Sequence, residues 1–417
     1  MSEAGAGPVR IERIAAGGDG VGRLADGRVV FVPRTAPGDL VQLTAVDLRA
    51  RFARARVNRV LEPGPDRVEA LCTHYSADHC GGCQLQHLSS AAQLAARRRI
   101  VGDALRRIAR LPLEDPELEP APRQWNYRNR ITLTWSGVGN RLGFHPYGRA
   151  GDVFELRRCE IAAAPLNEAL PGLRRTRAGF PPDLERVTLR TESPAGRTAR
   201  LDVVLHGPTA PPGDPLHSLL VAQGGDRPVG VWWRPRPGDT RLLQGDAGGG
   251  PAASFSQVDL ERGDRIRRFA LELVGGLDGR HAWDLYAGRG EASTLLADAG
   301  ATVESVELDR VAVDAARASD ARAAIIRHQG RVETVAGRLA PPWAVYANPP
   351  REGLGPAVVA ALRRAAPRRI AYVSCDPATF ARDLRALGPQ YDIESLRAFD
   401  LFPQTAHVET VVLLAHR

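Results

Sequence analysis

Signals for strands and helices alternate along residues 251–417, and this alternation limits the possible folds more than any other feature of the chain. Strand-like apolar runs occur at 282–287, 302–309, 343–350, 369–375 and 407–416. Segments with helical spacing follow several of them, at 310–323, 356–365 and 377–387. Because parallel strands need long crossover connections, usually helices, the pattern predicts a doubly wound α/β sheet.

The first 62 residues are predicted to form a small closed β-barrel. Short runs of alternating apolar and polar residues occur at 9–15, 27–33, 39–46 and 53–62, with glycine-containing turns between them. Short strands with turns at this spacing are typical of oligonucleotide-binding barrels. A Pro-Gly-Pro linker follows at 63–65.

The middle of the chain predicts an α+β domain. Three cysteines come first, and then a helix that Ser89 and Ser90 can cap and that ends before Pro112. Strand-like runs follow, and residues 207–250 are rich in Gly and Pro. The chain is therefore expected to be a multidomain α/β protein with boundaries at 1–62, 63–250 and 251–417.

A glycine loop follows the first strand of the last domain. Asp284–Gly290 leads from that strand into a helix, and Glu307 ends the next strand. Glycines let a ligand approach the backbone, and the start of the helix offers free N–H groups. An acid at this place accepts hydrogen bonds from ribose hydroxyls. Ser293 stands where a dinucleotide fingerprint has its third glycine, which favours S-adenosylmethionine over NAD. A tight turn without a ligand is the alternative.

Cys375 is the candidate nucleophile. It ends a strand, and Asp376 and Pro377 are suited to the N-cap and first position of the following helix. A helix N-terminus favours the thiolate over the thiol, and the carboxyl ends of strands are where α/β sheets bind ligands. A buried structural cysteine is the alternative.

Two further positions carry polar groups that chemistry could use. Glu409 interrupts an apolar strand, where an acid is costly unless it is paired or functional, although a solvated edge would also explain it. Asn348 precedes two prolines and Arg351 at a strand end. This loop resembles the Asx-Pro-Pro-aromatic motif of amino-group methyltransferases, but Arg351 replaces the aromatic residue.

Four of the five cysteines are spaced as metal ligands. Cys72, Cys80 and Cys83 lie close together, and Cys159 follows at a distance. The two glycines between Cys80 and Cys83 let a tight loop direct both sulfurs at one metal. Four thiolates suit either zinc or an iron–sulfur cluster, and unligated structural thiols are the alternative.

The charge of the chain comes from arginine alone. All 56 basic residues are Arg, which excludes Schiff-base, P-loop and kinase-type lysine chemistry. Codon usage in a GC-rich genome is the simple explanation. The distribution indicates more: residues 1–62 carry 10 Arg against 7 acids, residues 63–250 carry 25 against 20, and residues 251–417 carry 21 against 21. The excess in the first two segments indicates a phosphate-bearing partner such as RNA.

No apolar run is long enough to cross a membrane, and Met1–Gly7 has no signal-peptide character, so the expected location is cytoplasmic.

Together these segments resemble the RNA uracil-C5 methyltransferase family along nearly the whole chain. The barrel resembles a TRAM domain. The other matching segments are Cys80–His87, Ser254–Asp259, Asp284–Gly290, Ser374–Thr379 and His407–Val411.

The resemblance implies a Rossmann-like methyltransferase domain and two cofactors. A 4Fe-4S cluster would be held by Cys72, Cys80, Cys83 and Cys159. S-adenosylmethionine would bind in a pocket formed by Gln257, Tyr286, Gly288, Glu291, Glu307 and Asn348. Cys375 would add to C6 of uracil, and Glu409 would remove the C5 proton after methylation. The expected substrate is structured RNA, 23S ribosomal RNA before transfer RNA, and no obligate protein partner is expected.

Four departures from the family pattern bear on these expectations. The first cysteine interval is two residues longer than usual. Glu291, Arg338 and Asn348 differ from the usual residues near the cofactor and could lower its affinity. Two alternatives therefore stay open: an amino-group methyltransferase that uses Asn348, and an RNA-binding protein with impaired catalysis.

Overall fold

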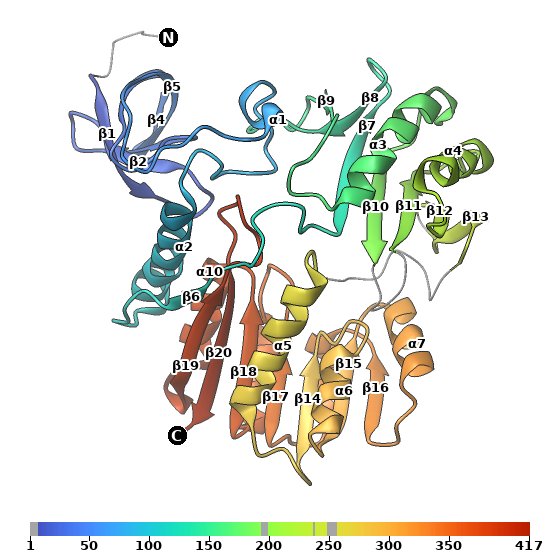
Figure 1. The fold of residues 1–417 in the computed structure, drawn as a ribbon. Coiled ribbons are helices and arrows are strands. Elements are labelled where there is room, and N and C mark those ends of the chain that lie inside the picture. The colour runs from blue at the N-terminus through green and yellow to red at the C-terminus, as the bar shows by residue number, and fades with distance from the viewer. Residues whose placement is uncertain (1–6, 193–198, 237, 248–256) are drawn as a thin grey trace. The chain divides into compact units, whose positions relative to one another are not determined.

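The computed structural model describes residues 7–192, 199–236, 238–247 and 257–417 (Figure 1). The chain forms two compact units. Unit 1 is made of Met1–Ala121, Cys375–Arg385 and Leu396–Thr410. Unit 2 is made of Pro122–Ser374, Ala386–Ser395 and Val411–Arg417. Both units are therefore discontinuous in sequence. The described residues contain no helix with the length and apolarity needed to cross a bilayer.

The N-terminal barrel of unit 1 confirms the expected closed β structure (blue in Figure 1). Its strands close in the order β1-β2-β3-β5-β4. They are β1 (Val9–Ile14), β2 (Gly20–Arg23), β3 (Val29–Val32), β4 (Leu40–Leu48) and β5 (Phe52–Glu62). Strand β2 lies in a segment read from the sequence as a turn. A Cβ at Gly20 would stand 1.9 Å from Thr35 Oγ1, so the glycine permits close packing there.

The rest of unit 1 surrounds one long helix. Its elements are α1 (Thr73–Ser76), α2 (Ser90–Ala104), the π-helical η1 (Leu105–Ala109) and β6 (Glu117–Glu119). Ser89 caps α2 as expected, because its hydroxyl accepts the N–H of Ala92 at 3.2 Å. The helical segment ends at Arg110, which has a left-handed φ of 63°.

One apolar cluster joins four parts of unit 1. It contains Ile14 and Ala36 of the barrel, Leu85 and Leu88 of the cysteine segment (residues 72–88), Ala96 and Ile100 of α2, and Ala406. The segment before β20 is thus packed into the same core as residues that lie three hundred positions earlier.

Unit 2 contains a mostly antiparallel sheet in the order β13-β12-β11-β10-β7-β8-β9. Its strands are β7 (Arg130–Ser136), β8 (Arg141–Phe144), β9 (Phe154–Glu155), β10 (Arg186–Glu192), β11 (Arg200–His206), β12 (Val229–Arg234) and β13 (Arg241–Gly245). Its helices are α3 (Ala164–Thr176), η2 (Arg177–Gly179) and α4 (Asp214–Gly224). Residues 207–250, marked in the sequence only by Gly and Pro, therefore include α4, β12 and β13.

The second sheet confirms the doubly wound α/β expectation. Its order is β16-β15-β14-β17-β18-β20-β19-β6, and the neighbouring strands from β16 to β18 are parallel. The strands are β14 (His281–Leu285), β15 (Thr302–Glu307), β16 (Ile325–Gln329), β17 (Ala344–Ala347), β18 (Arg369–Ser374), β19 (Tyr391–Phe399) and β20 (Glu409–His416). The helices are α5 (Leu260–Val274), α6 (Glu291–Asp298), α7 (Arg310–Ser319), α8 (Val332–Val335), η3 (Ala336–Arg338), α9 (Gly355–Ala365), α10 (Pro377–Leu387) and η4 (Gly388–Gln390).

Helices pack on this sheet close to the glycine loop. Helix α5 contacts β17 and β18, and α6 contacts β14, β15 and β16 (Figure 1). The loop between β14 and α6 therefore leaves the carboxyl end of a central parallel strand, the usual ligand-binding end of such a sheet.

Candidate functional site

The glycine loop of unit 2 begins at a buried acid. Asp284 is fully buried on β14 and accepts a 2.5 Å hydrogen bond from the hydroxyl of Ser293. Burial raises the pKa of Asp284 to about 6, although the Ser293 hydroxyl opposes part of this shift. The hydrogen bond joins the end of the strand to the first turn of α6, so it stabilises the loop between them.

The loop itself has the backbone that a close ligand approach requires. Tyr286, Gly288 and Gly290 have φ angles of 63°, 56° and 81°. The N–H of Gly288 donates to Glu307 Oε2 at 2.8 Å, and the other carboxylate oxygen accepts the N–H of Asp309 at 2.8 Å. The structure therefore brings Glu307 to the loop, as the sequence predicted.

This loop fits a nucleoside-type cofactor. A Cβ at Gly288 would meet nothing within 4 Å, so the backbone borders open space there. Each oxygen of Glu307 accepts one backbone N–H and keeps a lone pair for a ligand hydroxyl. Gly290 begins α6 as its N-cap, which leaves N–H groups at the helix start.

The other predicted cofactor residues also lie in unit 2. The carbonyl of Gln257 accepts a 2.9 Å hydrogen bond from Asn129 Nδ2, and its side chain lies against Gly263, where a Cβ would approach its Cγ to 2.6 Å. Asn348 follows β17, and its N–H donates to Leu285 O at 3.4 Å.

Glu291 is exposed at the start of α6, and Arg338 is exposed in η3. Ser254, Phe255, Ser256 and the domain boundary near Gly250 lie outside the described residues.

Two residues that the sequence did not single out form contacts at the predicted cofactor segments of unit 2. Arg289, inside the glycine loop, forms a 3.5 Å ion pair with Glu192 at the end of β10. The backbone N–H of Asn129 donates to Val258 O at 2.7 Å, and its side-chain amide donates to the carbonyl of Gln257. Neither position has a local sequence signal, because each partner lies in another part of the chain.

Cys375 belongs to unit 1 and lies at a helix N-terminus as predicted. It is partly exposed and immediately follows β18. Asp376 Oδ1 accepts the N–H groups of Ala378 and Thr379, both at 2.9 Å, which confirms the N-cap. Helix α10 then begins at Pro377. Because its carboxylate is hydrogen-bonded to the helix, Asp376 stabilises the turn that presents Cys375.

Glu409 also belongs to unit 1. It is the first residue of β20, and its exposed fraction is only 2%. Val408 and Thr410 on either side are fully buried. The solvated edge position considered from the sequence is therefore wrong, because Glu409 is buried at the start of the strand.

The cysteine segment of unit 1 is buried and densely bonded. Cys72, Cys80 and Cys83 are all buried, and the N–H of Gly82 donates to Cys80 Sγ at 3.4 Å. Gln86 Oε1 accepts the N–H of Cys72 at 3.3 Å.

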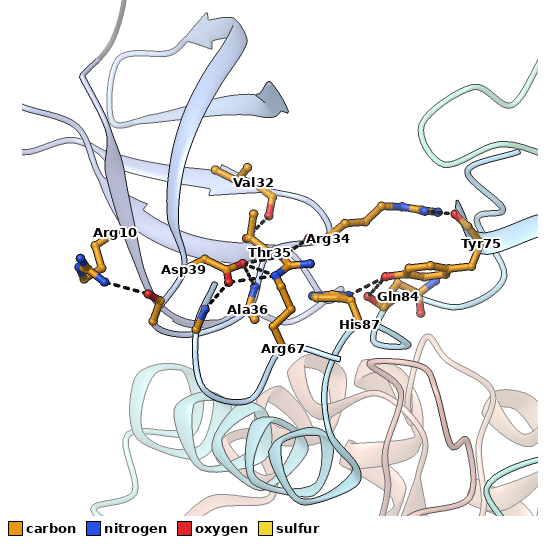
Figure 2. A network of polar contacts seen from close by, with 12 residues as sticks. Arg10, Val32, Arg34, Thr35, Ala36, Asp39, Arg67, Tyr75, Gln84 and His87 are labelled. Carbon is orange, nitrogen blue, oxygen red and sulfur yellow. Dashed lines mark hydrogen bonds and ion pairs between the residues drawn. The ribbon is translucent and has the colours of Figure 1, made fainter. Parts of the chain in front are cut away.

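Arg34 and Arg67 connect this segment to the barrel (Figure 2). The Arg34 guanidinium lies 4.0 Å from the centre of the Tyr75 ring and donates to Cys80 O at 3.0 Å. Arg67 pairs with the fully buried carboxylate of Asp39. The Tyr75 hydroxyl is 2.6 Å from His87 Nδ1, and burial lowers the pKa of His87 to about 4 while it raises that of Tyr75.

The predicted four-cysteine centre is not confirmed. Across the described residues, no three His, Cys, Asp or Glu side chains are grouped as ligands of one metal ion. Cys159 belongs to unit 2, where its N–H donates to Asn167 Oδ1 at 2.8 Å. Cysteine thiolates are the ligand type that thiophilic metals prefer, so the residue types remain suitable although the structure does not group them.

Two family models match the chain. Residues 341–417 match the tRNA (uracil-5-)-methyltransferase model, and residues 8–57 match the TRAM domain model.

Whole-length relatives agree with these matches. An uncharacterized RNA methyltransferase of Nitratidesulfovibrio vulgaris is 30% identical, over 98% of this chain and 96% of its own length. A 23S rRNA (uracil(1939)-C(5))-methyltransferase of Aromatoleum aromaticum is 30% identical, over 97% of this chain and 98% of its own.

A solved structure shares the fold. The Pyrococcus abyssi tRNA (uracil-54, C5)-methyltransferase, solved with S-adenosyl-L-homocysteine, superposes with a TM-score of 0.72. It is 23% identical and covers 98% of this chain and all of its own.

Proposed function

The chain belongs to the RNA uracil-C5 methyltransferase family, and from this premise we propose that it methylates one uridine of 23S ribosomal RNA through Cys375 and Glu409. The family itself supplies the reaction class: methylation of uracil C5 in RNA with S-adenosylmethionine. The ribosomal substrate is supported by whole-length similarity to a relative with that name. The observation that carries the mechanism is Cys375 at the capped N-terminus of α10.

Cys375 activates the base. Uracil C5 is a weak nucleophile until a thiolate adds to C6 and leaves an enolate whose negative charge reaches C5. The N-terminus of α10 favours the thiolate, since the helix dipole stabilises negative charge. The adjacent Asp376 carboxylate is bonded to two backbone N–H groups, which compensate part of its charge.

Glu409 completes the reaction as the base. After C5 has gained its methyl group, the C5 proton passes to the Glu409 carboxylate. The C5–H electron pair forms the C5–C6 double bond, the C6–S bond breaks, and Cys375 leaves as thiolate. The burial of Glu409 supports this role, because the residue is only 2% exposed and bulk water is largely excluded from it.

The glycine loop of unit 2 is the proposed cofactor site. When bound, S-adenosylmethionine supplies an electrophilic methyl group. Glu307 would accept hydrogen bonds from the ribose hydroxyls, and the backbone at Gly288 and Gly290 would border the ligand. Gln257, Tyr286, Glu291 and Asn348 would line the same pocket.

The cysteine set remains part of the proposal. We assign Cys72, Cys80, Cys83 and Cys159 to a 4Fe-4S cluster, with zinc as the other candidate. The amide of Gly82 that donates to Cys80 Sγ supports a thiolate there, since such bonds stabilise ligand sulfur. No step of the reaction above uses the cluster.

Metal analysis of protein purified without oxygen tests this assignment. About four iron atoms per chain, visible absorption of an iron–sulfur chromophore, and loss of both in Cys83→Ser would support it. One zinc per chain would replace the cluster by a structural zinc site. Protein that contains neither iron nor zinc would overturn the proposal.

The mechanism is tested with RNA that carries 5-fluorouridine. Fluorine at C5 cannot leave as the proton does, so the wild-type protein should accumulate a covalent, methylated RNA adduct on Cys375. Cys375→Ala should form none. Glu409→Gln should still form the adduct, and with ordinary uridine it should release product about 10²–10⁴-fold more slowly. Mass spectrometry of the peptide–nucleotide conjugate measures each outcome.

Two results would contradict this proposal. An active Cys375→Ala variant would exclude the covalent route and favour methylation of an amino group. Methylation of transfer RNA transcripts in preference to 23S transcripts would reassign the substrate but keep the mechanism.

A further inference from the structure

The segment from Asp400 to Val408 joins β19 to β20 and places Glu409 at the start of β20. It contains no helix or strand, yet Gln404 and Thr405 are only about 3% exposed within it. A buried irregular segment must obtain hydrogen bonds for its backbone from elsewhere. All the contacts described next lie within unit 1.

Gln93 of α2 binds Gln404 twice. Its Nε2 donates to Gln404 Oε1 at 3.0 Å, and its Oε1 accepts the backbone N–H of Gln404 at 3.1 Å. Gln404 has a φ of 69°, a left-handed conformation that is unfavourable for a residue with a side chain. The two bonds hold this strained residue in place.

Arg97 lies one helical turn after Gln93 and binds the same segment. Its guanidinium donates to Thr405 O at 2.9 Å and pairs with Asp400 Oδ2 at 2.9 Å. Neither charged side chain has any exposed surface. A buried ion pair contributes little net stability but strongly disfavours any arrangement that separates its members.

The cysteine segment supplies the remaining contacts. Gln404 O accepts the N–H groups of Gln84 and Leu85 at 3.1 and 3.0 Å. The N–H of Ala406 donates to Gln84 Oε1 at 3.4 Å. Together with Gln93, these bonds engage both backbone groups of Gln404.

We propose that Gln93 and Arg97 are positioning residues for the Glu409 carboxylate. They hold Gln404 and Thr405 in one conformation, so β20 begins at a fixed place and the carboxylate is ready for the C5 proton. The inference rests on the proposed function in one respect, that Glu409 removes this proton. It predicts that loosening α2 from the segment slows elimination and leaves the earlier addition and methyl transfer intact.

The test is Gln93→Met, which keeps the volume of the side chain and removes both bonds to Gln404. With RNA that contains ordinary uridine, this variant should accumulate a methylated covalent adduct on Cys375. The rate constant for adduct decay should fall roughly 10- to 100-fold, as expected for a displaced catalytic group. Single-turnover methyl transfer and the Kd for S-adenosylmethionine should remain at wild-type values.

Two further variants separate positioning from folding. Ala95→Met adds the same side chain on the exposed face of α2. The adduct of this variant should decay at the wild-type rate. The double variant Arg97→Met/Asp400→Leu removes both buried charges, so it should fold, but it lacks the bond to Thr405 O and should still decay slowly.

Either of two results would overturn the inference. One is wild-type adduct decay in a folded Gln93→Met or double variant. The other is an equal slowing of methyl transfer and elimination, since that would indicate a general structural role. If the wild-type protein forms no adduct with 5-fluorouridine RNA, the proposed mechanism itself fails. The wild-type experiment is therefore done before the variants are compared.

Discussion

Buried acids distinguish this protein at the scale of single residues. Asp284, Asp400 and Glu409 are each at most 2% exposed, and each is stabilised or used in a different way. Asp400 has a buried arginine partner, Asp284 has a serine hydroxyl, and Glu409 is the proposed base. An acid in an apolar run is therefore a useful signal, but its role depends on the partner that the fold brings to it.

Asp284 makes stability depend on pH. Burial raises its pKa from 3.8 to about 6, so the folded state binds its proton more tightly than the unfolded state does. The resulting stabilisation is present below pH 4 and is lost as the pH rises through 6, a change of roughly 3 kcal/mol.

Denaturant unfolding of wild type and Asp284→Asn at pH 4 and pH 7 measures this effect. The asparagine cannot ionise, so the unfolding free energy of the variant relative to that of wild type should be higher at pH 7 than at pH 4. A stability difference that does not change with pH would show that Asp284 titrates normally.

At the scale of elements, β5 presents arginines on the outside of the barrel. Ala53 and Ala55 are buried inside, and Arg54 and Arg56 alternate with them on the exposed face. Arg54 also lies 5.9 Å from the centre of the Phe31 ring and 3.5 Å from Asp19. A charged strand face with an aromatic ring is suited to the backbone and bases of RNA.

Neutralising this face should weaken RNA binding. Replacing Arg51, Arg54 and Arg56 by Gln should lower the slope of log K against log salt by about 2–3, because each phosphate contact contributes about 0.7–0.9. Affinity for S-adenosylmethionine should not change.

A charge-matched control removes three exposed arginines of unit 2, at Arg310, Arg317 and Arg322. Binding titrations over a range of salt concentrations compare the two triple variants. Equal losses in both would show that net charge, and not the β5 face, governs binding.

At the scale of the whole molecule, the excess of arginine lies in residues 1–250, while residues 251–417 are neutral. The two compact units do not follow this division, since the segments with Cys375 and Glu409 belong to the same unit as the barrel. Residues proposed for catalysis are thus supported by parts of the chain far from them in sequence.

Local patterns were sufficient for much of the fold and of the candidate site. The barrel, the doubly wound sheet, the Ser89 and Asp376 caps and the approach of Glu307 to the glycine loop all follow from periodicity, turn chemistry and spacing. These features depend on neighbours within a few residues or on one repeated unit. The missed strands are β2, β6, β12, β13, β16 and β19. Glycine or polar residues hide strands that pair at close approach or near a sheet edge.

The sequence by itself determined the chemistry of this protein: which thiol, which carboxylate and which glycine loop are available. Only the tertiary structure decided what holds them in place. Gln93 meets Gln404 and Arg97 meets Asp400 across about three hundred residues, and neither side chain carries a local mark of its partner. The reason is physical: buried polar groups must be paired, but folding chooses the partner from the whole chain.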